Sequence, residues 1–179
     1  MRKRQNLTLF VALVTLAIGC SREDIRWEQK FAVVEEGVLL RSRLPTIPRL
    51  EEVEQRYGIR TIVNLLSHKE INQPECEAEQ KFADRHGIKF VHLPIIDNPS
   101  PEVIKRFLEI VNNSTNQPVL VHCRDGTVRT GVFVAIYRIE HQGWPPQKAL
   151  DEMALYAFKA KSPRYKQVAD FILGYASKR

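Results

Sequence analysis

A strand, a tight loop and a helix within residues 118–140 constrain the fold more than any other feature of the sequence. Residues 119–121 are Val-Leu-Val and end at His122, a pattern that predicts a buried strand. The chain then turns within a few residues that include Gly126 and enters a second apolar run at 132–137. That run leaves a helix almost no polar face, so we expect this helix to lie at the centre of a domain.

The rest of the chain alternates between short β-rich runs and helical periodicities. Strands are expected near 31–34, 38–41, 59–66 and 89–93, and helices near 49–57 and 74–86, after Ser100, and near 146–158 and 163–176. This alternation predicts one α/β domain with a central, mostly parallel sheet of about four to five strands flanked by helices. Sites in such sheets lie at the carboxyl ends of the strands, and the 119–121 strand leads directly to Cys123.

The loop that follows this strand combines a cysteine, five residues and an arginine. Successive backbone amides of such a loop can point inward, and the N-terminus of the next helix adds its positive end. Arg129 can bind two phosphate oxygens through its planar guanidinium. The same field favours the thiolate form of Cys123, which is the nucleophilic form. The loop therefore predicts an anion-binding site that carries its own nucleophile.

The stretch 122–131, His-Cys-Arg-Asp-Gly-Thr-Val-Arg-Thr-Gly, resembles the signature of cysteine-dependent protein tyrosine and dual-specificity phosphatases. The resemblance implies the fold of that family and hydrolysis of phosphate monoesters through a phosphocysteine on Cys123, with Arg129 stabilising the transferred phosphoryl group. It also implies that His122 orients the loop and favours the thiolate, and that Thr130 helps the thiolate to leave in the second step. The residues expected to contact the phosphate are Arg124, Asp125, Gly126, Thr127, Val128 and Arg129.

Two further stretches extend the resemblance over residues 31–140. Residues 41–45, Arg-Ser-Arg-Leu-Pro, are similar to an Arg-Ser-x-x-Pro stretch in an atypical, bacterial branch of the family. Residues 58–65 are similar to the strand that follows it in that branch. Arg43 stands where the branch often has glycine, so the role of this turn stays open.

The leaving oxygen of a phosphate ester needs a proton, and the family supplies it from an aspartate on a loop before the catalytic strand. Asp97 follows the expected strand at 89–93 and precedes the helix that Ser100 opens. It is therefore the predicted general acid. The alternative role for Asp97 is that of a turn residue, and Asp125 is the rival acid.

Residues 1–19 are predicted to be an export signal. Three cations precede an apolar stretch from Leu7 to Gly19 that is short for a membrane span. The segment 16–20, Leu-Ala-Ile-Gly-Cys, resembles the lipobox of bacterial lipoproteins, which implies a lipid on Cys20 and an anchor on the periplasmic or extracellular face of a bacterial membrane. Residues 20–30 would then be a lipidated N-terminus and polar spacer with little structure, and 31–179 the phosphatase domain. A plain signal peptide and a short uncleaved anchor remain the alternatives.

The formal net charge of +6 includes the three early cations, which leaves +3 for the remaining chain. These charges are scattered, so nothing predicts a nucleic-acid partner. His68, His86, His92 and His141 lack the spacing of zinc ligands. We expect neither a metal nor another cofactor, since Arg129 and the loop amides supply the positive charge.

Two alternative functions compete with a phosphatase. A rhodanese-type sulfurtransferase also uses a loop cysteine, although its loop generally places the arginine one residue closer. A pseudophosphatase would bind phosphate without hydrolysing it. Among phosphatases, the signature is shared by enzymes for phosphotyrosine, phosphoserine, phosphothreonine, inositol phosphates and lipid phosphates, so the substrate stays open. Cys76 is expected to be a buried thiol or a disulfide partner that protects Cys123.

Overall fold

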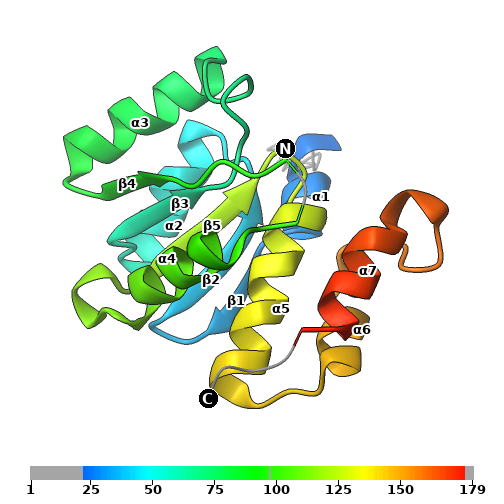
Figure 1. Ribbon diagram of the computed structural model, residues 1–179. Helices are drawn as coiled ribbons and strands as arrows, with labels where there is room; N and C mark the ends of the chain where they lie inside the picture. The colour runs from blue at the N-terminus through cyan, green and yellow to red at the C-terminus, as the bar shows by residue number, and fades with distance from the viewer. Residues whose placement is uncertain (1–21, 97, 176–179) are drawn as a thin grey trace, which may run out of the picture.

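The computed structural model describes residues 22–96 and 98–175, and in this part of the chain a five-stranded sheet has the order β1-β2-β5-β3-β4 (Figure 1). β1 pairs antiparallel with β2, and the other neighbours are parallel. This arrangement confirms the predicted α/β class. The strands are β1 (Ala32–Glu35), β2 (Leu39–Arg43), β3 (Thr61–Asn64), β4 (Lys89–His92) and β5 (Val119–Cys123).

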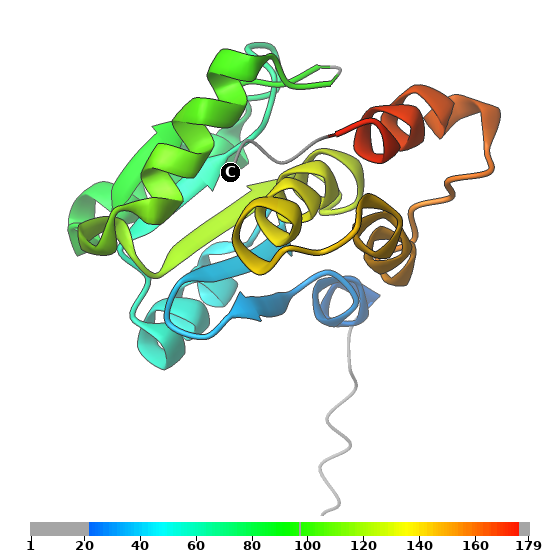
Figure 2. The same ribbon diagram turned by 60° about the horizontal axis from the view of Figure 1, so that its bottom comes forward.

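Helices cover both faces of the sheet (Figure 2). The first face packs against α1 (Arg22–Glu28), α2 (Ile47–Tyr57) and α3 (Pro74–His86), and the second against α4 (Pro101–Asn112) and α5 (Val128–Gln142). Successive side chains of a strand point to opposite faces, and both sets are apolar here, as in Leu120 against Val121. Burial on both faces explains why β5 has a continuous apolar sequence rather than an alternating one.

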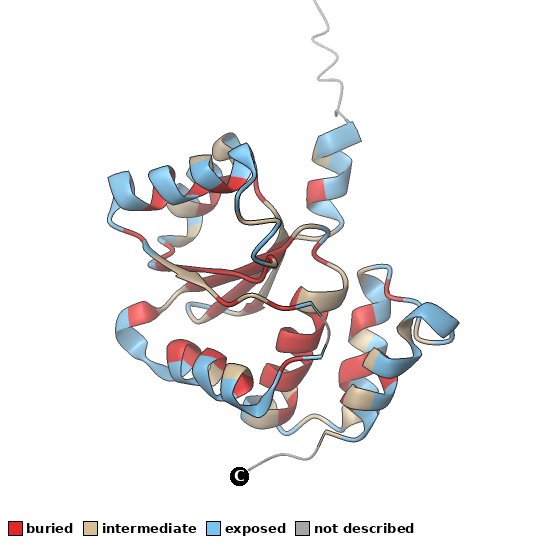
Figure 3. Cartoon of the chain, turned by 45° about the horizontal axis from the view of Figure 1, so that its top comes forward, coloured by how far each residue is buried: buried red, intermediate tan, exposed pale blue. Residues whose placement is uncertain are grey.

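The most buried helix is α5, as its sequence predicts. Residues 130–137 are all buried in this helix, because the sheet covers one side of it and two later helices cover the other (Figure 3). These are α6 (Pro146–Leu155) and α7 (Lys166–Leu173), joined through a 3₁₀ turn at Pro163–Tyr165. A second 3₁₀ turn, Ser114–Asn116, connects α4 to β5.

The helix ends follow the sequence signals closely. Gly58 and Gly87 end α2 and α3 in the left-handed conformation, and the Ser100 hydroxyl accepts the Val103 amide at the start of α4. The last predicted helix, 163–176, is divided into the 3₁₀ turn and α7.

The prediction of a spacer with little structure at 20–30 is wrong for Arg22–Glu28, which forms α1. Trp27 explains the difference, because its side chain is 4% exposed and joins the core below the sheet. It also stacks on Phe31 with ring centroids 5.3 Å apart. One buried aromatic residue thus fixes a helix whose other side chains are mostly exposed.

The predicted export signal and Cys20 lie outside the described residues. Within 22–96 and 98–175, none of the helices has the length and apolar character needed to cross a membrane.

Candidate active site

Cys123 is the last residue of β5, the strand that lies between β2 and β3 in the sheet. The register places it beside Arg43 of β2. The chain then forms a tight loop and enters α5 at Val128. We call residues 123–129 the Cys123 loop. Its position at the carboxyl end of a central parallel strand is the one that the sequence predicts.

Gly126 lets the Cys123 loop pass close to the end of β2. Its φ angle is +66°, a conformation that side chains disfavour. A Cβ atom at this position would lie 2.7 Å from the Arg43 nitrogen and 2.8 Å from the Ser42 carbonyl oxygen. Both the backbone angle and the available space therefore require glycine here.

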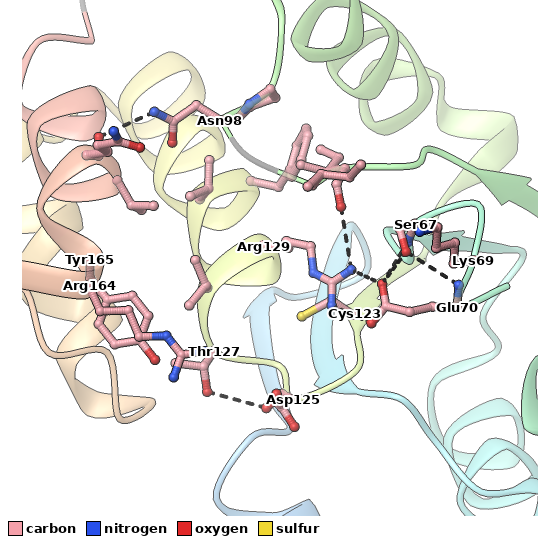
Figure 4. A pocket seen from close by; sticks show the side chains of 18 of the residues that line it. Ser67, Lys69, Glu70, Asn98, Cys123, Asp125, Thr127, Arg129, Arg164 and Tyr165 are labelled. Carbon is pink, nitrogen blue, oxygen red and sulfur yellow. Dashed lines mark hydrogen bonds and ion pairs between the residues drawn. The ribbon is translucent and has the colours of Figure 1, made fainter. Parts of the chain in front are cut away.

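Arg129 extends from the first turn of α5 into the site, next to the sulfur of Cys123 (Figure 4). Its guanidinium makes a two-pronged ion pair with Glu70, with Nη1 2.6 Å from Oε2 and Nη2 3.0 Å from Oε1. Nη1 also donates to the Leu65 carbonyl at 3.3 Å. The guanidinium is therefore held beside the thiol before any substrate arrives.

Glu70 is a functional residue that the sequence analysis missed. Its carboxylate accepts the Ser67 amide at 2.9 Å and the Ser67 hydroxyl at 2.8 Å, in addition to Arg129. The hydrogen bonds from Arg129 hold the pKa of Glu70 well below its usual range. The available signal was its place in a polar segment after β3, at the same sheet edge as Cys123.

His122 is anchored from behind by a buried carboxylate. Its Nε2 lies 2.8 Å from Oε1 of Glu79, and both side chains are fully buried. Asn64 donates to the other oxygen of Glu79 at 2.8 Å. This chain of contacts joins β3, α3 and β5 at the residue that precedes Cys123.

Other predicted site residues differ in their surroundings. Thr130 is buried and donates its hydroxyl to the Ser42 carbonyl at 3.4 Å. Asp125 is exposed and lines the pocket. Asp97 lies outside the described residues, whereas Asn98 beside it lines the pocket and donates to the Gln167 carbonyl of α7 at 3.3 Å.

The pocket above Cys123 has a volume of about 930 Å³ and two unlike sides (Figure 4). One side comes from the segment after β3 and is polar, with Ser67, His68, Lys69 and Glu70. The other comes from the segment after β4, α5 and the C-terminal helices, and its apolar members are Ile95, Ile96, Pro99, Val128, Val132, Phe133, Ala157, Tyr165 and Val168. Arg164 adds a cation to that side. Sequence reasoning did not anticipate that the C-terminal helices form a wall of the site.

Both cysteines in the described part of the chain are free thiols. Cys76 is buried, and desolvation raises its pKa to about 11, so this thiol stays protonated near neutral pH. Among the described residues, no group of three or more His, Cys, Asp or Glu side chains is placed to hold a metal ion.

A buried thiol at the start of a tight loop, with an oriented guanidinium beside it, is the arrangement of cysteine-dependent phosphatases. The family model described as "DSP-PTPase phosphatase fused to NAD+ Kinase" matches residues 47–170. The chain therefore belongs to the cysteine-dependent dual-specificity phosphatase family, as the signature predicts.

Curated relatives agree with this assignment. The chain is 34% identical over 133 residues to the inositol diphosphatase DSP1 of Oryza sativa subsp. japonica. The matched region covers 71% of this chain and 56% of that relative. It is 31% identical over 119 residues to the dual specificity protein phosphatase TpbA of Pseudomonas aeruginosa, which covers 64% and 49%. The chain thus spans about half the length of these relatives.

Solved structures show the same fold. The catalytic domain of the PP-IP phosphatase SIW14 from S. cerevisiae superposes with a TM-score of 0.70 at 26% identity, over 84% of this chain and 87% of that one. TpbA from P. aeruginosa superposes with a TM-score of 0.61 at 26% identity, over 78% and 81%.

Proposed function

We propose that this phosphatase hydrolyses phosphate monoesters, phosphotyrosine first among them, through a phosphocysteine on Cys123. The observation that carries the proposal is the guanidinium of Arg129, which Glu70 holds beside the Cys123 sulfur (Figure 4). The planar guanidinium can donate hydrogen bonds to two phosphate oxygens, and the backbone amides of the loop can donate to the third.

The first step transfers the phosphoryl group to sulfur. The thiolate of Cys123 attacks phosphorus, the S–P bond forms and the ester P–O bond breaks. The departing oxygen takes a proton, and Asp97 is the proposed donor because its neighbours Ile96 and Asn98 line the pocket. Asp125, on the Cys123 loop itself, is the rival donor.

The second step returns the enzyme to its starting state. A water molecule attacks the phosphorus, gives its proton to the carboxylate that acted as the acid, and displaces the thiolate of Cys123. His122 and Thr130 are the proposed supporting residues. His122, which contacts Glu79, is proposed to position the loop. Thr130, one residue after Arg129, is proposed to help the thiolate to leave.

Replacing the nucleophile tests the reaction. Cys123→Ser should lose turnover of p-nitrophenyl phosphate by about 10⁴-fold or more, while it still binds inorganic phosphate. Cys76→Ala removes the other free thiol of the described residues and should keep turnover, because Cys76 is buried outside the pocket. Retained turnover in Cys123→Ser would refute the mechanism.

The apolar side of the pocket supports an aryl phosphate as the substrate. The aromatic ring of phosphotyrosine can pack against Tyr165 and Val168 while its phosphate reaches the Cys123 loop. Tyr165→Ala should then lower kcat/KM for a phosphotyrosine peptide by about tenfold and change turnover of a phosphoserine peptide less. Equal losses on both peptides would contradict this contact.

Inositol phosphates are a second candidate, supported by a different observation. Several relatives are inositol diphosphatases, and Lys69 and Arg164 bring cations to opposite sides of the pocket (Figure 4). A polyphosphorylated ring can contact both, and so can a lipid phosphate head group. Comparing kcat/KM across phosphopeptides, inositol phosphates and phosphoinositides, in the wild type and in Lys69→Ala, separates these substrates. Loss confined to the inositol compounds would favour the second candidate.

Sulfur transfer and silent phosphate binding are the remaining alternatives. Cyanide-dependent thiocyanate release from thiosulfate would identify a rhodanese. Phosphopeptide binding without any hydrolysis would identify a pseudophosphatase. Both outcomes contradict the proposed reaction, which the five-residue spacing between Cys123 and Arg129 supports.

We also propose that the protein is exported and anchored through a lipid on Cys20, on the basis of the signal-like residues 1–19 and the lipobox-like segment before Cys20. Mass spectrometry of the N-terminal peptide tests this proposal. A diacylated Cys20 as the first residue supports it, and an unmodified Cys20 in the mature protein removes it.

A further inference from the structure

Two cations lie against the Cys123 loop outside the pocket. Arg41 of β2 donates from Nη2 to the Gly126 carbonyl at 2.5 Å. Lys30, which follows α1, donates from Nζ to the Thr127 hydroxyl at 3.0 Å and to the Tyr156 carbonyl. The guanidinium of Arg41 stacks on the Tyr156 ring, 3.4 Å from its centroid. We call Arg41 and Lys30 the rear cation pair.

The charge of this pair is not neutralised by a direct carboxylate contact. Arg41 is 1% exposed, and its Nε and Nη1 atoms have no hydrogen-bond partner. Within 22–96 and 98–175, neither cation has a carboxylate oxygen within 4.0 Å. A buried cation without an anion is unfavourable, so a negative charge on the Cys123 loop would relieve it.

Electrostatic effects on the two cations agree with this picture. Burial lowers the pKa of Lys30, and repulsion from Arg41 lowers it further. Burial also lowers the pKa of Arg41 to about 10. Asp125 and then Cys123 act in the opposite direction on the pKa of Lys30, and Tyr156, Glu152 and then Cys123 do so on the pKa of Arg41. An anionic sulfur therefore stabilises both charged forms, and by reciprocity both cations stabilise the anion.

The contact with Gly126 also sets the direction of a loop amide. The carbonyl of a trans peptide and the N–H of the next residue point in opposite directions. Because the Gly126 carbonyl points to Arg41, the Thr127 N–H points away from β2, to the side where Thr127 lines the pocket. The Leu44 amide donates a hydrogen bond to the Arg124 carbonyl at 3.3 Å, so a second carbonyl of the loop is also oriented by the segment after β2.

We propose that Arg41 and Lys30 are positioning residues that aim the Thr127 amide at the substrate phosphate and stabilise the thiolate of Cys123 from outside the pocket. The proposal rests on the phosphatase reaction proposed above. It gives a role to Arg41 of the Arg-Ser-x-x-Pro stretch and to Lys30, a residue of the segment that the sequence predicts to be a spacer.

Other charged groups lie on or next to the Cys123 loop and are unchanged in the variants. They are His122 with Glu79, Arg129 with Glu70, and Arg124 and Asp125 on the loop. Glu152 and Arg138 act on Arg41 from α6 and α5. The experiment therefore compares variants that change only the rear cation pair.

The test measures iodoacetamide alkylation of Cys123 in the full chain against pH, resolved by peptide mass spectrometry. Lys30→Met should raise the pH of half-maximal alkylation by about half a unit and Arg41→Met by about one unit, since each removes a nearby positive charge. Lys30→Arg keeps the charge and should restore the wild-type midpoint. Lys89→Met removes a lysine that bonds Asn116 at 3.1 Å, outside the pocket, and should leave the midpoint unchanged.

A purely structural role gives a different result. If folded Lys30→Met loses activity while the alkylation midpoint stays within about 0.1 unit of wild type, the proposal is overturned. Circular dichroism identifies any Arg41→Met sample that has not folded, and Lys30→Met then decides, since Lys30 is only partly buried. If the variants show these shifts but the wild type hydrolyses no phosphate ester, the proposed function alone is contradicted and the electrostatic role stands.

Discussion

Arg129 and Arg41 contact the Cys123 loop from different sides and in different environments. Arg129 faces the pocket with 19% of its side chain exposed and is paired with Glu70. Arg41 is 1% exposed and bonds the Gly126 carbonyl without a carboxylate within 4.0 Å among the described residues. Two arginines thus contact the same loop, one paired with a carboxylate in the pocket and one buried against a backbone carbonyl on the β2 side.

The difference suggests separate tests for the two sides of the loop. On the pocket side, Glu70 pairs with Arg129 and orients its guanidinium. On the β2 side, Arg41 has no carboxylate oxygen within 4.0 Å among residues 22–96 and 98–175, and its guanidinium bonds the Gly126 carbonyl of the loop instead. Changes on the pocket side should therefore affect phosphate binding and transfer, and changes on the β2 side should alter the geometry of the loop.

Among changes on the two sides of the Cys123 loop, the largest loss is expected for Arg129→Lys. An ammonium keeps the charge but cannot form the two parallel hydrogen bonds of a guanidinium, so kcat/KM for p-nitrophenyl phosphate should fall by about a thousandfold. Arg106→Lys on α4, where the arginine is exposed near Glu109, is the matched control and should retain wild-type kinetics. A loss of less than about tenfold would show that charge alone is sufficient on the pocket side.

The next largest effect is expected for Gly126→Ala, on the β2 side. The new methyl group meets the backbone of Ser42 and Arg43 at 2.7–2.8 Å, so the loop must shift, and kcat should fall by about a hundredfold. The free energy of unfolding should fall by about 2–3 kcal/mol, from strain at positive φ and from the clash.

Gly87→Ala is the matched control for this prediction. Its φ angle is +65°, close to that of Gly126, but nothing lies within 4 Å of the added Cβ. Chemical denaturation should give a loss of about 1 kcal/mol for Gly87→Ala, with unchanged kcat. Equal losses of stability and activity in the two variants would show that backbone strain, and not contact with β2, decides the effect at Gly126.

Arg129 and Gly126 could be identified from the sequence because their signals are local. The Cys123 loop occupies a few consecutive residues between an apolar strand and an apolar helix, and both neighbours form as predicted. Helix ends marked by Gly58, Gly87 and Ser100 were predictable for the same reason. Local patterns thus gave the architecture and the centre of the site.

The supporting residues could not be found in this way. Glu70 lies 59 residues from Arg129, and Lys30 lies 97 residues from Thr127. The sequence around a carboxylate in a polar segment does not indicate which distant residue it will contact. The helical state of Arg22–Glu28 was missed because it depends on the burial of Trp27 in a core formed by later elements.

A smaller loss of activity is expected for Glu70→Gln, which tests how much the ion pair on the pocket side contributes. The amide can still accept a hydrogen bond but no longer pairs with the charge of Arg129, so the guanidinium is less firmly oriented. We expect kcat/KM to fall by about tenfold, with the change mainly in kcat. Glu109→Gln on α4 is the matched control, and an unchanged rate in Glu70→Gln would show that Leu65 and the loop alone orient Arg129.

The smallest effect is the acid dependence of stability that the Glu70–Arg129 pair produces. The pKa of Glu70 is lowered in the folded state, chiefly by the hydrogen bonds from Arg129. The pair therefore stabilises the fold fully above the unfolded-state pKa of about 4.3 and loses this contribution as the pH falls through the lower folded-state value.

Comparing the unfolding free energies of the wild type and Glu70→Gln from pH 7 to pH 3 tests this prediction. Solvent screens a pair that is about one quarter exposed, so the difference should be about 0.5–1 kcal/mol near neutral pH. It should shrink below about pH 4, because there the carboxylate takes up a proton in the unfolded wild type while it stays ionised in the folded protein. A difference that grows towards acid pH would mean that the ionised carboxylate of Glu70 destabilises the fold. The pocket side would then resemble the β2 side, where a charged side chain is unfavourable until a phosphate or a thiolate is present.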